Sequence, residues 1–148
     1  MDNSRYVQKD CNILDIGCGN GIILVELAKR GFVNLTGCDY SEQAIALARN
    51  IAEREHVKIE YVVVDILDLE NSKLKGKHFD VCVDKGTYDA ISLNPENSKK
   101  CRELYKKYLA HLLNTDGIFA LASCNWTIDE LKEFFKSGKR ISRFENLD

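Results

Sequence analysis

The sequence lacks any apolar run long enough to cross a membrane. Its longest hydrophobic stretches have the length of β-strands, far short of the ~20 residues that a spanning helix needs. No segment has the pattern of a signal peptide or a transit peptide. We therefore expect a cytoplasmic protein with no membrane partner.

A surplus of positive charge is also missing. The chain carries 21 lysines and arginines against 23 acidic residues, a formal net charge of −2. General nucleic-acid binders normally carry a basic surplus. We expect no nucleic-acid partner.

The six cysteines form no Cys-x-x-Cys pair, and the three histidines are isolated from one another. Cys38, Cys82 and Cys124 lie in or beside apolar runs, which is typical of small core residues in a reducing compartment. No group of residues has the spacing of metal ligands. We predict neither a disulfide framework nor a metal site.

The chain has the size and composition of one globular domain spanning residues 1–148. Hydrophobic residues make up 45% of the 148 residues and charged residues 30%, an ordinary balance for a folded domain of this length. A chain of this length can bury about two thirds of its unfolded surface, enough for a stable core without disulfides or bound metal.

Short apolar runs alternate with helical patterns along the chain. Strands are predicted at 12–16, 34–38, 58–64, 78–83 and 118–123. Helices are predicted at 22–30, after a Ser41 cap, after Pro95, and from a Thr127–Glu130 capping box. Residues 68–77 read as a loop with a helical turn, and 114–117 as a turn. Strands separated by helices predict a doubly wound α/β fold with a mostly parallel sheet.

A glycine-rich turn joins the first strand to the first helix. It reads Asp15-Ile-Gly17-Cys18-Gly19-Asn-Gly21, so glycine alternates with other residues rather than following the Gly-x-Gly-x-x-Gly spacing of most dinucleotide enzymes. Such glycines allow a sharp turn and a close approach of the backbone to a ligand. The helix start that follows favours a negatively charged group.

Acidic residues follow the next three strands. Asp39 ends the second strand, where a carboxylate can accept both hydroxyls of a ribose. Asp65, with the backbone of Ile66, follows the third strand, where it could read an adenine edge, and Asp84 follows the fourth. Because ligands of such sheets bind beyond the carboxyl ends of the strands, these acids and Asp15 together predict a nucleoside-binding site.

This order of motifs resembles the class I S-adenosylmethionine-dependent methyltransferases. The resemblance implies S-adenosylmethionine as the cofactor. It implies the following cofactor-binding residues: Asp15, Gly17, Cys18, Gly19, Gly21, Asp39, Tyr40, Asp65, Ile66 and Asp84.

Two further segments resemble a narrower group. Residues 84–95, DKGTYDAISLNP, and 123–127, SCNWT, are similar to signatures of the protein-lysine methyltransferases that modify translation elongation factor 1-alpha, the methyltransferase-like 10 group. The similarity extends over about residues 12–135. It implies methyl transfer to a lysine amine of a protein, with elongation factor 1-alpha as the partner and no metal.

The resemblance also implies an acceptor site at the end of the fourth strand. Asp84 is expected near the incoming amine or the amino group of the cofactor, while Thr87, Tyr88, Asn125 and Trp126 line the acceptor channel. An aromatic wall can hold a cationic amine. A lysine amine, whose ordinary pKa is about 10.4, must first lose its proton.

The chain departs from that family at both ends. Little sequence precedes the first strand, and residues 140–148 could supply at most one strand of the carboxyl-terminal hairpin that family members carry. We therefore expect a core that is truncated at both ends. We also expect a monomer.

Other functions share part of the pattern. A small-molecule methyltransferase would share every cofactor motif, and only the 84–95 and 123–127 segments argue against it. A methyltransferase of nucleic-acid amines would favour an Asp/Asn-Pro-Pro-Tyr type motif after the fourth strand, and a nicotinamide-dependent reductase would need Tyr-x-x-x-Lys; neither motif is seen. A non-catalytic nucleotide-binding partner protein also remains open.

Overall fold

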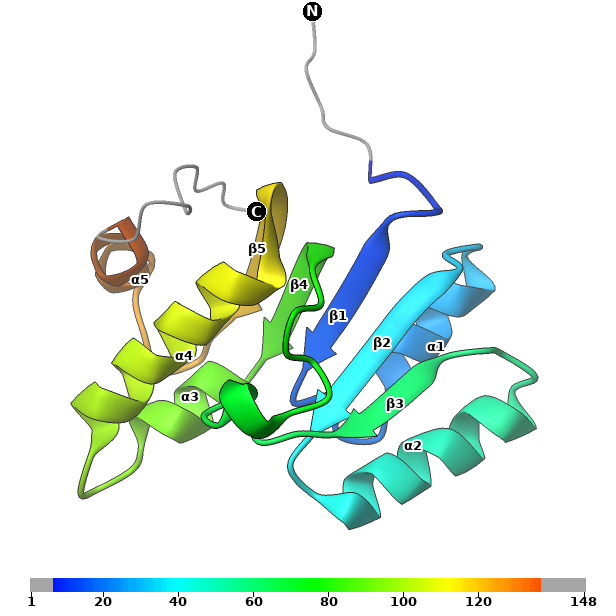
Figure 1. The fold of residues 1–148 in the computed structure, drawn as a ribbon, viewed down its shortest axis with the longest axis horizontal. Helices are drawn as coiled ribbons and strands as arrows, with labels where there is room; N and C mark the ends of the chain where they lie inside the picture. Colours follow the sequence, from blue (N-terminus) through cyan, green and yellow to red (C-terminus); the bar gives the residue numbers. More distant parts are fainter. Residues whose placement is uncertain (1–6, 137–148) are drawn as a thin grey trace, which may run out of the picture.

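The computed structural model describes residues 7–136 of the chain. The strands are β1 (Asn12–Ile16), β2 (Asn34–Asp39), β3 (Glu60–Val63), β4 (Phe79–Lys85) and β5 (Leu113–Ala122). The helices are α1 (Ile22–Lys29), α2 (Glu42–Arg54), α3 (Thr87–Ser92), α4 (Ser98–Leu112) and α5 (Ile128–Lys136), with a 3-10 turn η1 (Leu69–Asn71). Figure 1 shows their arrangement.

The five strands form one parallel sheet in the order β3-β2-β1-β4-β5. The predicted doubly wound fold is confirmed. From β1 the chain moves outward to β2 and β3, then crosses back to place β4 on the other side of β1 (Figure 1). The strand order therefore reverses between β1 and β4, and ligands of open α/β sheets bind at such a point.

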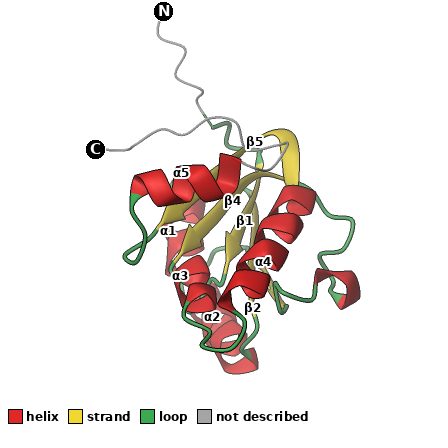
Figure 2. Ribbon diagram, turned by 90° about the vertical axis from the view of Figure 1, so that its left-hand side faces the viewer, coloured by secondary structure: helices red, strands yellow, loops and turns green. Residues whose placement is uncertain are grey.

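Alternate residues of β1 feed two separate hydrophobic cores. Ile13 packs with Leu24 of α1 and Ile45 of α2. Leu14 packs on the other face in a cluster that includes Leu109 of α4. This division follows from the two-residue repeat of a strand, and Figure 2 shows helices on both sides of the sheet. The central strands β1 and β2 are thus buried on both faces, whereas most of the edge strand β5 is partly buried or exposed.

Two helix starts follow the sequence predictions. The Ser41 hydroxyl accepts a hydrogen bond from the amide of Ala44 at 3.2 Å, at the start of α2. The Thr127 amide donates to the Glu130 carboxylate at 2.8 Å, and the Glu130 amide donates back to the Thr127 hydroxyl at 3.3 Å. Both caps satisfy amides that a helix start leaves without a partner.

Helix α3 was not predicted from the sequence. It follows β4 after only Gly86, which has a left-handed φ of 96°. The first amides of α3 are capped by Asp84, a residue within β4, so its cap lies outside the usual position just before the helix.

Strand β5 begins earlier than predicted. Leu113 already pairs with Phe79, and the next pair joins Ile118 to Val81 with a shift in register. Residues 114–117, predicted as a turn, therefore form an irregularity inside the strand, as a β-bulge does. Strand β3 is shorter than the predicted 58–64.

All six cysteines are free thiols. Cys38 and Cys82 are buried as predicted, whereas Cys124 is exposed, so its assignment to the core was wrong. Cys124 follows the end of β5 in a connecting loop, where no layer covers it. Within residues 7–136, no helix is long and apolar enough to cross a membrane. The strand considered at 140–148 lies outside the described residues.

Candidate functional site at the carboxyl edge of the sheet

The glycine turn after β1 forms the centre of the candidate site. Gly17, Gly19 and Gly21 all have left-handed backbones, with φ of 68°, 54° and 77°. The Cys18 amide donates to the Cys38 carbonyl at 2.8 Å, which ties the turn to the end of β2. The Cys18 side chain itself is buried. The turn thus leads from β1 into α1 with its backbone held at the sheet edge.

The three glycines are required for different reasons. A side chain at Gly17 would collide with the hydroxyl of Thr87, and one at Gly21 would collide with the ring of Tyr61. Gly19 has no heavy atom within 4 Å of the position that a Cβ would take. Two glycines therefore permit internal packing, and Gly19 alone leaves space at the surface for a ligand.

The Asp39 carboxylate lies directly against this space. Its Oδ2 accepts from the Gly19 amide at 3.0 Å, and its Oδ1 accepts from the Ser41 amide at 2.9 Å. A carboxylate offers about four lone-pair sites, so two remain for a ligand. The next residue, Tyr40, is 81% exposed and leaves its ring available at the same edge.

Asp65 lies further along the edge, beyond β3. It is exposed, and its Oδ1 accepts from the Leu67 amide at 2.9 Å. Ile66, beside it, turns its side chain into the core and is 7% exposed. Asp65 is accessible, while Ile66 can contribute only backbone atoms to a ligand at this edge.

Asp15 is a buried carboxylate beneath the turn. It is 2% exposed, and its Oδ2 has no hydrogen-bond partner. Burial raises the pKa of Asp15 to about 7; the negative charge of Asp84 adds to the rise, and Lys85 opposes it. An ionised Asp15 is therefore costly in the protein alone, and a cationic group nearby would stabilise it.

Asp84 is fully buried, with 0% exposure. Its two oxygens accept from the amides of Thr87 and Tyr88 at 2.8 and 2.9 Å and from the hydroxyl of Tyr105. Burial raises the pKa of Asp84, and these hydrogen bonds oppose the rise. The sequence prediction placed this side chain near an incoming amine or the amino group of the cofactor; in the structure it caps α3 and binds the Tyr105 hydroxyl of α4.

Tyr88 also differs from its predicted place on a channel wall. The side chain is 0% exposed and packs among aromatic rings 5.4 to 6.1 Å away, those of Tyr105, Trp126, Phe134 and Phe135. The Tyr88 ring of α3 is therefore part of the core, where it packs between residues of α4 and α5. Thr87 lies nearer the glycine turn, where its hydroxyl donates to the Ile16 carbonyl at 2.9 Å.

Asn125 and Trp126 lie in the loop between β5 and α5. Asn125 is exposed, and Trp126 is partly buried, with the Arg102 guanidinium 4.9 Å from its ring centre. The loop is held by Asp89, a buried acid of α3 that sequence reasoning did not single out. Its signal was a second acid within the DKGTYDA segment, five residues after Asp84.

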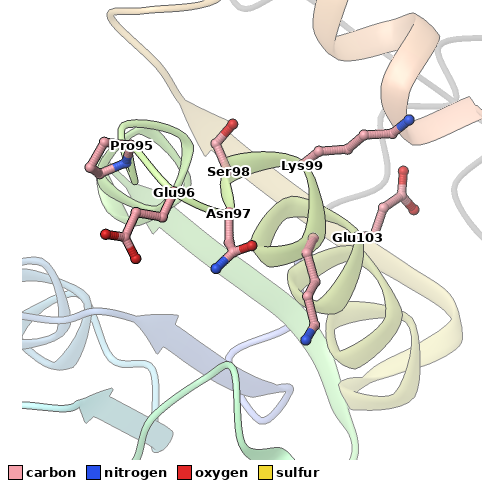
Figure 3. Close-up of a pocket in the computed structure, with 7 residues that line it drawn as sticks. Pro95, Glu96, Asn97, Ser98, Lys99 and Glu103 are labelled. Carbon is pink, nitrogen blue, oxygen red and sulfur yellow. The ribbon is translucent and has the colours of Figure 1, made fainter.

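A shallow depression lies elsewhere, at the start of α4. Figure 3 shows its lining residues, among them Glu96, Lys99 and Glu103. None of the predicted site residues belongs to it. Its acidic and basic side chains balance and do not converge on one point (Figure 3), so it has no marks of a specific ligand site. In the described part of the chain, no three histidine, cysteine or acidic side chains gather as metal ligands would.

Comparisons with known proteins identify relatives of this chain. The profile of the methyltransferase domain family matches residues 7–145. The human protein named EEF1A lysine methyltransferase 2 is 49% identical over 140 residues, which cover 90% of this chain and 58% of that protein. The fission yeast (Schizosaccharomyces pombe) protein-lysine N-methyltransferase efm4 is 40% identical over 137 residues, 85% of this chain and 57% of that one. The chain spans less than two thirds of the length of these curated relatives.

Solved structures show the same fold. PKMT2 from Rickettsia typhi, in complex with AdoHcy, has a TM-score of 0.64 at 27% identity, covering 78% of this chain and 21% of that one. A TehB-like SAM-dependent methyltransferase from Corynebacterium glutamicum has a TM-score of 0.67 at 23% identity, covering 88% and 66%. The second likeness shows the fold alone.

Alanine substitutions should separate the three glycines. At each position an alanine must adopt the left-handed backbone that the glycine has now, which costs roughly 1–2 kcal/mol. Gly17→Ala and Gly21→Ala add a collision with Thr87 or Tyr61, and overpacking costs about 1–3 kcal/mol more. Urea denaturation should therefore show Gly19→Ala as the mildest variant. Equal destabilisation by all three would contradict the open space at Gly19.

The burial of Asp15 predicts a pH dependence of stability. A folded-state pKa of about 7 against about 3.9 in the unfolded chain means that the folded protein binds the extra proton. The stability that this proton contributes is present below about pH 4 and is lost as the pH rises to about 7. The free energy of unfolding, relative to that of the uncharged variant Asp15→Asn, should fall across this range and then level off. A difference that does not change with pH would refute the prediction.

Proposed function

We propose that this chain, which belongs to the methyltransferase domain family, carries the S-adenosylmethionine site of an enzyme that methylates a lysine of translation elongation factor 1-alpha. The observation that carries the proposal is the open backbone at Gly19 beside the Asp39 carboxylate. Because the chain spans under two thirds of its curated relatives, the proposal concerns the full-length protein.

The residues at the sheet edge fit this cofactor in shape and charge. Asp39 keeps lone pairs for the two hydroxyls of a ribose, and Tyr40 and Asp65 are exposed after β2 and β3, where they would contact the adenosine. The Gly17–Gly21 turn would hold the amino-acid end. Asp15 has one buried oxygen without a hydrogen-bond partner, and once ionised it would supply negative charge to the cationic part of the cofactor.

The cofactor, when bound, supplies an activated methyl group on a sulfonium centre. The protein's own residues would position the two reactants, and good positioning alone can lower a barrier by about 7–11 kcal/mol. The predicted acceptor residues nearest the surface are Thr87, Asn125 and Trp126. The Trp126 ring, which already lies by the Arg102 guanidinium, would contact the lysine side chain, and the exposed Asn125 side chain would accept a hydrogen bond from its amine.

Asp84 and Tyr88 enter this proposal in a changed role. Both are fully buried, so they would shape the acceptor side by placing α3 rather than by touching the amine. The lysine amine would then lose its proton to solvent or to a group brought by the full-length enzyme.

The substrate is supported by relatives matched along most of the chain. Proteins from zebrafish (Danio rerio) and mouse with 45% and 48% identity share the name EEF1A lysine methyltransferase 2. A Rickettsia akari ubiquinone biosynthesis O-methyltransferase is 41% identical over only 71 residues, 48% of the chain. Small-molecule methylation is therefore only the second candidate, because the match to that relative covers 48% of the chain.

The free thiols and the proposed protein substrate both bear on where the enzyme acts in the cell. Six free thiols fit a reducing compartment, and a soluble elongation factor is a cytoplasmic partner. We place the enzyme in the cytoplasm and expect it to act as a monomer.

Asp39→Ala should weaken cofactor binding. Hydrogen bonds to a charged group contribute ~1.5–3 kcal/mol, so the dissociation constant for S-adenosylmethionine should rise at least about tenfold. Isothermal titration measures this change directly. The control is Asp68→Ala, which removes an exposed acid bonded only to the Asn71 side chain. Unchanged affinity in the Asp39 variant would remove Asp39 from the cofactor site.

Trp126→Ala should affect the acceptor and spare the cofactor. The experiment incubates full-length enzyme, methyl-labelled S-adenosylmethionine and recombinant elongation factor 1-alpha, and mass spectrometry then locates the label. We expect a labelled lysine with the wild type. With the variant, we expect kcat/KM for the elongation factor to fall about tenfold while the dissociation constant for the cofactor stays within about threefold.

The same experiment decides between the candidate functions. Label on a small metabolite, with the elongation factor unmodified, would refute the protein substrate and favour the second candidate. Cofactor binding with no transfer to any acceptor would favour a non-catalytic nucleotide-binding partner protein.

A further inference from the structure

Asp89 makes its hydrogen bonds across the fold rather than within its own helix. It lies in α3 and is 8% exposed. Its Oδ1 accepts from the Ser123 hydroxyl at 2.5 Å, and its Oδ2 accepts from the Cys124 amide at 2.8 Å. The start of α3 is capped by Asp84, so Asp89 is not needed for that purpose. Its carboxylate serves the loop that follows β5.

Ser123 passes this constraint to the next residues. Its oxygen accepts from the Asn125 amide at 3.3 Å and from the Trp126 amide at 3.2 Å. A hydroxyl has one donor and two acceptor sites. Because its proton goes to Asp89, both lone pairs are directed at the two amides. Three consecutive amides, those of residues 124–126, therefore depend directly or indirectly on Asp89.

The side chains of this loop are only partly covered by the rest of the fold. Cys124 and Asn125 are exposed, whereas Trp126 packs against the core, with the Tyr88 ring at 6.1 Å and the Arg102 guanidinium at 4.9 Å from its own ring. These stacking contacts restrain the ring but not the main chain. The main chain of residues 124–126 is thus held by hydrogen bonds that converge on the Asp89–Ser123 pair.

Helix α3 also touches the cofactor side. The hydroxyl of Thr87, its first residue, donates to the Ile16 carbonyl at 2.9 Å, immediately before the glycine turn. Two residues further on, Asp89 holds the loop after β5. One short helix therefore sets the distance between the glycine turn and the loop that carries Asn125 and Trp126.

We propose that Asp89 is a positioning residue, which acts through Ser123 to place Asn125 and Trp126 against the methyl acceptor. This inference rests on the proposed function and deepens it, because it names what orients the acceptor side of the same site. Asp89 touches neither cofactor nor substrate. Its removal should impair methyl transfer to the protein and leave cofactor binding intact.

Three variants test the pair. Asp89→Ala removes both acceptors, and Ser123→Ala removes the hydroxyl that holds residues 125 and 126. Asp89→Asn keeps one acceptor for the Cys124 amide, but its NH2 would donate to a Ser123 oxygen whose lone pairs are already used. We therefore expect the order wild type, Asp89→Asn, Asp89→Ala in every measurement of loop position. Glu133→Ala, an exposed acid of α5, is the matched control.

Trp126 reports on the loop without any substrate. It is the single tryptophan of the chain, so its fluorescence emission follows the position of this loop alone. Asp89→Ala and Ser123→Ala should shift the emission to longer wavelength, while far-ultraviolet circular dichroism stays unchanged. The double variant should shift it no further than Asp89→Ala does, because the two residues act as one unit.

Kinetics of the full-length enzyme complete the test. With elongation factor 1-alpha as acceptor, kcat should fall at least about tenfold in Asp89→Ala and by less in Asp89→Asn. The dissociation constant for S-adenosylhomocysteine should stay within about threefold. If Asp89→Ala fails to fold, Asp89→Asn and Ser123→Ala decide the question, since both keep part of the network.

Two results would overturn the proposal. One is an unchanged emission wavelength of Trp126 together with a kcat within about twofold of wild type in Asp89→Asn and Ser123→Ala. The other is an equal loss of cofactor affinity and turnover, which would mark a general structural role. A wild-type enzyme that leaves the elongation factor unmodified would refute the proposed function, while the emission of Trp126 would still show whether Asp89 holds the loop.

Discussion

The Asp84 carboxylate, buried at the end of β4, accepts hydrogen bonds from the amides of Thr87 and Tyr88 and from the hydroxyl of Tyr105. This contact starts α3, fixes its direction against the sheet and ties it to α4. Without such a cap, the first amides of a helix buried at this depth would have no partner. The position of α3 in turn decides where the glycine turn and the loop after β5 lie relative to each other. Asp84 is fully buried, so it affects the edge of the sheet only through the position that it gives to α3.

Three acidic side chains lie close to this edge of the sheet. Asp15 and Asp84 are both buried, and the charge of Asp84 adds to the raised pKa of Asp15. Asp39 lies on the same edge, bonded to the Gly19 amide. Like charges in a region of low dielectric raise the free energy of the protein alone. In the proposed function, the positive charge of the cofactor would lower this cost, which Lys85 already opposes in part.

The site is built mainly from backbone and from buried acids rather than from a deep cavity. The depression at the start of α4 contains none of the site residues, while the open space at Gly19 is formed by the turn itself. Methyl transfer asks chiefly for correct placement of two reactants. A rigid sheet edge with a short helix wedged between two loops suits that requirement, because each loop is fixed by hydrogen bonds to residues distant in sequence, as Asp89 is to Ser123.

The amino-acid sequence by itself determined the parallel sheet, the glycine turn and the acids at the strand ends. These follow from local periodicity and from the rule that parallel strands end at one edge, and Asp15, Gly19 and Asp39 lie at that edge as expected. Only the tertiary structure decided that Asp84 and Tyr88 are buried, that α3 exists as a helix, and that Asp89 holds residues 123 and 124. Those features depend on contacts between segments far apart in the chain, and no pattern within a single segment records which distant donor a carboxylate will meet.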